Sequence, residues 1–116
     1  MKLCRVGELG KEKAVIIDKD GSYKDLSGAI SDLDPKTLNF ETFEKISKLN
    51  LKDLPILDKN SRIGACVKNP SKFLGIGLNF RDHATEQNLP IPKEPIIFSK
   101  FTNCIVGPND NIEVPK

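Results

Sequence analysis

The sequence has few aromatic residues and no dominant charge, and both features argue against nucleic-acid binding. Its 116 residues include no Trp, one Tyr and six Phe, too few for a platform on which nucleic-acid bases stack. The 18 Lys and Arg are balanced by 16 Asp and Glu, giving a net charge of +2. Basic and acidic residues alternate along the chain, so no basic stripe is available to follow a phosphate backbone. We therefore expect no nucleic-acid partner.

Long hydrophobic runs are also missing. The longest are four or five residues, as in Ala14–Ile17, whereas a helix that spans a bilayer needs about 20. The first residues, M-K-L-C-R, show no apolar core followed by a cleavage site, which a secretory signal requires. The sequence predicts neither export nor a membrane partner.

Cysteine is scarce and widely spaced. Cys4, Cys66 and Cys104 are odd in number and form no Cys-x-x-Cys pair, which argues against a disulfide framework and against a zinc site. Three free thiols are typical of a reducing compartment. We expect a cytoplasmic protein.

The N-terminal part predicts a small sheet. Residues 2–6, 14–17 and 22–26 are strand candidates, and Asp18-Lys19-Asp20-Gly21 forms a turn in which the glycine permits a tight reversal. A helix follows, with Asn39 as its N-cap.

The apolar positions of this helix recur at three-residue spacing and predict a face packed on a core. They are Phe40, Phe43, Ile46 and Leu49. On the opposite face, Glu41–Lys45 and Glu44–Lys48 are expected to pair as i,i+4 neighbours.

Between residues 51 and 70 the periodicity is lost among prolines and turn residues. We place a domain boundary near 68–71, which gives domains 1–70 and 71–116. The second domain predicts strands at 73–77, 96–101 and 112–114, a short helix over 82–88 and a turn at 107–110.

Two features of the second domain suggest chemistry. Gly75-Ile76-Gly77 has Phe80 where a dinucleotide-binding loop needs its third glycine, so that interpretation is rejected. His83 is the only histidine, and Glu86 follows on the same helical face, with Asn79 as a candidate N-cap. Such a pair can act as a general base whose tautomer the carboxylate fixes, although a surface pair has the same spacing.

The wider sequence resembles a known family. Residues 73–84 are F-L-G-I-G-L-N-F-R-D-H-A, residues 92–100 are P-K-E-P-I-I-F-S-K, and residues 105–108 are I-V-G-P. These strings are similar to the fumarylacetoacetate hydrolase family, in its ureidoglycolate lyase and diketo-deoxy-sugar-acid hydrolase branch. Phe80 stands where the family usually has Tyr, and Arg81 occupies a position that the family pattern leaves open.

The resemblance implies an α+β, mostly β fold, with a small N-terminal α+β domain and then the opening strands of a β-rich catalytic domain. It implies that His83 and Glu86 are a catalytic dyad that activates water for attack on a carbonyl carbon. Lys100 matches a lysine beside the active site and is a candidate contact for an anionic substrate, with a solvated strand lysine as the alternative. The implied substrates are 2,4-dioxo acids such as acylpyruvates, and relatives are usually homodimers.

The resemblance also implies a Mg²⁺ or Mn²⁺ cofactor, but its carboxylate ligands lie downstream of the segment present here. The acidic cluster of Asp18, Asp20 and Asp25 is better explained as a hydrated turn. This chain is therefore expected to hold no metal ligands and to be inactive alone. It is either part of a longer enzyme or a truncated, non-catalytic module, and a lyase, isomerase or decarboxylase on the same scaffold is the enzymatic alternative.

Overall fold

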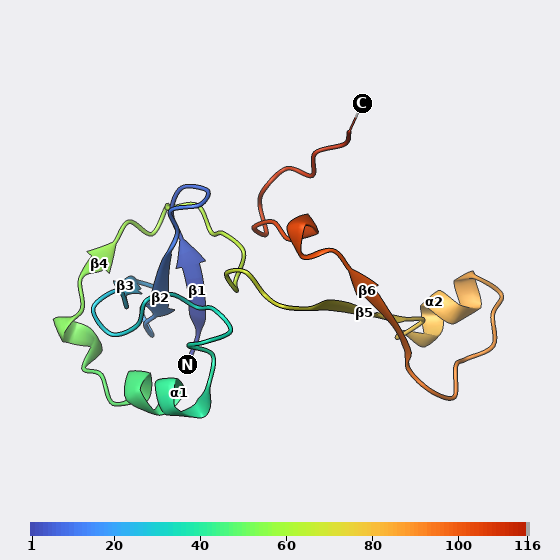
Figure 1. Ribbon diagram of the computed structural model, residues 1–116, viewed down its shortest axis with the longest axis horizontal. Helices are drawn as coiled ribbons and strands as arrows, with labels where there is room; N and C mark the ends of the chain where they lie inside the picture. The colour runs from blue at the N-terminus through green and yellow to red at the C-terminus, as the bar shows by residue number, and fades with distance from the viewer. Residues whose placement is uncertain (116) are drawn as a thin grey trace. The chain divides into compact units, whose positions relative to one another are not determined.

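A computed structural model describes residues 1–115 and shows an α+β fold in which strands predominate (Figure 1). The chain forms two compact units: Met1–Pro70 with residues 105–115, and Ser71–Cys104. The segment after Cys104 thus belongs to the first unit, whereas the sequence predicts that it belongs with 71–104. The division into domains that fold separately stays a prediction.

The first unit is built on a four-stranded antiparallel sheet whose strands follow one another in chain order. They are β1 (Leu3–Val6), β2 (Lys13–Ile17), β3 (Tyr23–Asp25) and β4 (Ile56–Leu57). The structure confirms the three predicted strands. β4 was not predicted, because two residues are too few to show an alternating pattern.

The predicted turn between β2 and β3 is confirmed. The Gly21 amide donates to the Asp18 carbonyl at 3.0 Å, and Gly21 has a φ of +82°, a conformation that glycine adopts without strain. The turn sets the register in which Ile17 faces Tyr23.

Helix α1 (Phe40–Ser47) begins as predicted, because the Asn39 side chain accepts from the Thr42 amide at 2.8 Å. Its apolar stripe is only partly buried. Ile46 is 1% exposed, but Phe40 is 93% exposed, so the prediction that Phe40 packs on the core is wrong. In the first turn of a short helix, this side chain lies beyond the part of α1 that packs on the core.

One of the two predicted pairs on α1 forms. Lys48 Nζ lies 2.6 Å from Glu44 Oε1, which confirms that pair. The Glu41–Lys45 pair is wrong, since Lys45 Nζ donates to the Ala29 carbonyl at 2.6 Å. An exposed Lys–Glu pair contributes only about 0–1 kcal/mol, so such a pair is easily replaced by another contact.

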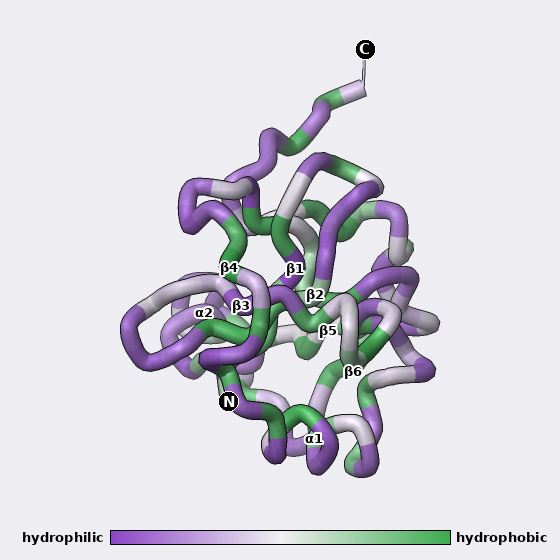
Figure 2. Tube along the Cα trace, turned by 90° about the vertical axis from the view of Figure 1, so that its left-hand side faces the viewer, coloured by the Kyte–Doolittle hydropathy of each residue, from purple (hydrophilic) through white to green (hydrophobic). Residues whose placement is uncertain are grey.

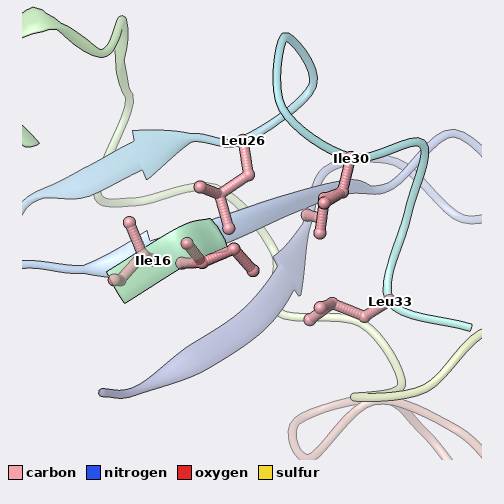
Figure 3. Packing of buried hydrophobic residues seen from close by; sticks show 6 residues of the cluster. Ile16, Leu26, Ile30 and Leu33 are labelled. Atoms are coloured by element: carbon pink, nitrogen blue, oxygen red, sulfur yellow. The ribbon is translucent and has the colours of Figure 1, made fainter. Parts of the chain in front are cut away.

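The sheet buries apolar residues on both faces, because alternate residues of β2 point in opposite directions. Figure 3 shows Ile16, Leu26, Ile30 and Leu33, which form one cluster with Ala14 and Ile46. Val15 packs on the other face against Cys4 and Val6. Burial on both faces explains the unbroken apolar run of β2.

The second unit is an antiparallel ribbon with a helix in its connection. β5 (Phe73–Gly77) pairs with β6 (Ile96–Lys100), and α2 (Arg81–Glu86) lies between them in the chain. Both predicted strands are confirmed. Two 3₁₀ helices, η1 (Leu51–Asp53) and η2 (Thr102–Cys104), complete the elements.

The last predicted strand is wrong. Residues 111–115 form no strand, and Ile112 and Val114 are more than four-fifths exposed, because no other described segment pairs with them. The predicted turn at 107–110 is confirmed by the Asp110 amide, which donates to the Gly107 carbonyl at 3.2 Å.

Hydrophobic and hydrophilic residues alternate along the whole trace in short stretches (Figure 2). Within residues 1–115, the helices are too short and too polar to cross a bilayer.

Candidate functional site

The turn from β5 into α2 positions the candidate dyad. Leu78, directly after β5, has a φ of +48°, a left-handed conformation that costs a non-glycine residue about 1–2 kcal/mol. The predicted N-cap is wrong: Phe80 is the N-cap residue, and no side chain caps the helix. Asn79 therefore precedes the cap position, because the left-handed turn starts α2 one residue later than predicted.

The structure brings His83 and Glu86 together. His83 Nδ1 lies 3.3 Å from Glu86 Oε2, and the two side chains are 54% and 73% exposed. In the tautomer protonated at Nδ1, the N–H group donates a hydrogen bond to the Glu86 carboxylate, and Nε2 keeps a free lone pair. The exposed ring can then accept a proton from a water molecule, as a general base does.

The helix that carries the dyad is anchored through one small residue. Ala84 is 1% exposed, and its carbonyl accepts from the Leu89 amide at 2.9 Å. Asn88, with a φ of +52°, ends the helix as residues in left-handed conformation commonly do. The dyad is thus on the open face of a helix whose other face is held.

Lys100 lies on an aromatic surface of the ribbon. Its Nζ is 5.3 Å from the centre of the Phe73 ring and 5.8 Å from that of Phe98, distances typical of cation–π contacts. Among residues 1–115 it forms no ion pair with Glu86. The structure therefore unites two of the three candidate site residues and leaves Lys100 with the aromatic pair.

Sequence reasoning gave Phe73 and Phe98 no part in the site. The alternation of strand residues offered a signal, because Phe98 and Lys100 are two apart and Phe73 is the cross-strand partner of Lys100. The pairing of the strands was needed to see it.

The described residues do not fit a divalent cation. No group of three or more His, Cys, Asp or Glu side chains converges within residues 1–115, whereas Mg²⁺ and Ca²⁺ need several oxygen ligands. The acidic turn is engaged internally. Hydrogen bonds from the Ser22 hydroxyl and amide hold the pKa of Asp20 below its ordinary value, and Asp25 accepts from Lys13 and Ser27.

An open hollow of about 330 Å³ is lined by the end of β5, the start of α2 and residues 91–95. Its polar lining includes Asn79, Arg81, Lys93 and Glu94. His83 and Glu86 do not line it, so the dyad faces elsewhere on α2.

Comparison with known proteins finds similarity along the whole chain. Residues 72–116 match the model of the fumarylacetoacetate (FAA) hydrolase C-terminal domain. The chain is 46% identical over 116 residues to a "putative hydrolase" of Burkholderia lata and 47% identical to one of Burkholderia multivorans. It superposes with a TM-score of 0.77 and 26% identity on the crystal structure of a "putative HpcE protein" from Mycobacterium smegmatis, over 99% of this chain.

The Burkholderia and Mycobacterium smegmatis matches cover all or nearly all of this chain but a smaller share of the relatives. The chain spans 41% of the length of each of the two Burkholderia proteins and 41% of the Mycobacterium smegmatis chain.

Proposed function

We propose that the chain belongs to the fumarylacetoacetate hydrolase family and is the N-terminal part of a hydrolase that cleaves a carbon–carbon bond in 2,4-dioxo acids. The observation that carries the proposal is the contact between His83 Nδ1 and Glu86 Oε2 at 3.3 Å on an exposed helix face. An imidazole oriented by a carboxylate, within the segment that matches the family model, supports this proposal.

In the proposed reaction, His83 acts as a general base and Glu86 is its positioning residue. Nε2 takes a proton from water, and the water oxygen bonds to the C4 carbonyl carbon of the substrate. The C3–C4 bond breaks, and its electron pair forms the enolate of a 2-oxo acid, which is then protonated. The products are one carboxylic acid and one 2-oxo acid.

Lys100 is proposed to contact the substrate carboxylate. Its ammonium group lies beside the rings of Phe73 and Phe98. These contacts hold the lysine side chain in one place, so a substrate carboxylate would bind a positioned charge.

Because the described residues do not fit Mg²⁺ or Mn²⁺, no step above passes through a metal ion. We propose that a divalent cation, if the complete hydrolase uses one, takes its ligands from residues outside this chain. Assembly as a homodimer likewise stays a proposal.

Product analysis tests the reaction class. The full-length hydrolase incubated with an acylpyruvate is expected to release pyruvate and the matching carboxylic acid in equal amounts. Decarboxylation, isomerisation or eliminative cleavage without uptake of water would contradict the proposal, and solvent ¹⁸O appearing in the carboxylic acid would support it.

A further inference from the structure

The Val-Gly-Pro turn, a motif for which the proposed reaction has no use, packs against residues 63 and 64 of the first unit. A Cβ atom on Gly107 would lie 2.3 Å from the Ile63 carbonyl oxygen and 3.1 Å from the Gly64 Cα. No real side chain tolerates the first distance, so the backbone of residue 107 has room only for glycine. The turn is therefore in direct backbone contact with residues 63 and 64.

The ion pair between Arg62 and Asp110 lies next to this contact and stabilises it. Arg62 Nε donates to Asp110 Oδ1 at 2.7 Å, and Arg62 Nη2 donates to Asp110 Oδ2. The same Oδ2 accepts from the Gly107 amide at 2.7 Å. Asp110 thus accepts a hydrogen bond within its own turn and also binds Arg62. The Arg62–Asp110 pair has the bidentate geometry typical of a specific arginine–carboxylate interaction.

Arg62 is itself held by the first unit. It donates to Glu12 at 2.9 Å and to the Gly7 carbonyl at 3.2 Å, and Glu12 in turn bonds Arg5. Beyond Arg5 the contacts continue through further side chains. The result is one chain of alternating charges: Lys68, Asp32, Arg5, Glu12, Arg62 and Asp110.

The two ends of this charge chain flank the segment that carries the dyad. Lys68 precedes the unit Ser71–Cys104 in sequence and Asp110 follows it. Both belong to the first unit, so the polypeptide is bound to that unit by ion pairs on both sides of residues 71–104.

We propose that residues 107–110 are a docking turn that binds residues 62–64 of the N-terminal unit, with Arg62 and Asp110 as the pair that determines the docking. The role of the Val-Gly-Pro motif is then to return the chain to the N-terminal unit. This inference does not depend on the proposed reaction.

Nuclear magnetic resonance of the 116-residue chain tests the docking. In Arg62→Met, the Gly107 amide is expected to exchange with solvent about tenfold faster, although Arg62 is not its hydrogen-bond partner. The cross-relaxation signal between Gly64 and Gly107 should disappear. Glu113→Gln removes a carboxylate that follows the turn in the chain. This control is expected to change neither the exchange rate of Gly107 nor the Gly64–Gly107 signal.

Asp110→Asn is the second variant, because it leaves the Arg62–Glu12 bond in place and so keeps the N-terminal unit folded. It too should lose the Gly64–Gly107 signal, while the Leu26 amide, bonded to Ala14 in the sheet, exchanges at its original rate. The proposal is overturned if the signal persists in both variants, or if Leu26 exchanges faster by the same factor as Gly107.

Discussion

At the residue scale, the ribbon that bears Lys100 depends on a missing side chain. Gly75 is the cross-strand partner of Phe98, and a Cβ atom on Gly75 would lie 2.5 Å from the ring. The ring therefore lies over the glycine, and from there it contributes one of the two aromatic faces near the Lys100 ammonium. The first glycine of the Gly-x-Gly pair is explained by this packing and not by a bound dinucleotide.

We predict that Gly75→Ala displaces Phe98 and destabilises the ribbon by about 1–3 kcal/mol, the usual cost of overpacking. Amide exchange of the β5–β6 hydrogen bonds measures the effect. Gly28→Ala is the matched control, because nothing lies within 4 Å of its Cβ position. Equal exchange rates in Gly75→Ala and the wild type would show that the ring can move at no cost.

At the scale of single elements, α1 shows which local signals are decisive. Its first turn has one side-chain cap, from Asn39 to the Thr42 amide, while only Ile46 is fully buried. A short helix with little buried surface relies strongly on its cap.

Replacing the cap tests this dependence. Asn39→Ala should lower the free energy of unfolding of the N-terminal unit by about 1 kcal/mol, and Asn39→Asp should retain most of it, because aspartate also caps well. Urea titration followed by circular dichroism gives both values. A loss of equal size in the two variants would mean that the amide group serves another purpose.

The local elements were predictable, and the long-range contacts were not. A short β-branched run identified β2, and the Asp-Gly pair identified the turn that leads into β3, since these signals lie within a few residues. The carboxylate partners of Arg62 are 48 and 50 residues away, and nothing in the local sequence indicates them. The prediction of a strand at 112–114 was wrong for a related reason: a strand also needs a neighbouring strand with which to pair.

The candidate site divides in the same way. The His83–Glu86 contact spans three residues on one helix and follows from helical geometry. The aromatic surroundings of Lys100 required the register of two strands, and the start of α2 required the left-handed conformation of Leu78, which its residue type does not indicate.

At the scale of the whole molecule, the alternating charge chain makes the first unit sensitive to acid. Burial raises the pKa of Asp32, but hydrogen bonds from Arg5 and the Leu33 amide outweigh it, and the pKa falls below its ordinary 3.8. The pKa of Glu12 also lies below its ordinary 4.5, because the hydrogen bond from Arg62 and the charges of Arg62 and Arg5 outweigh the effect of burial. Hydrogen bonds from Arg62 and the Gly107 amide lower the pKa of Asp110.

Since these pKa values are lower in the folded state, the unfolded chain binds protons at a higher pH than the folded chain does. The stability that the carboxylates contribute is thus complete above about pH 5 and is lost as the pH falls through 4.5 and 3.8 towards the lower folded values. Urea unfolding between pH 7 and pH 3 should show this decline, with a shallower slope in Asp110→Asn. A free energy of unfolding that stays constant down to pH 3 would contradict the assignment.

The most direct test of the account is the turnover of the full-length hydrolase on an acylpyruvate, compared between the wild type, His83→Ala and Gln87→Ala. Gln87 is the C-cap residue of α2, directly after Glu86, and serves as the matched control. If His83 is the general base, His83→Ala should lower kcat by about 10²–10⁴ with an unchanged unfolding transition, while Gln87→Ala keeps the wild-type rate. Turnover of His83→Ala at the wild-type rate would contradict the dyad.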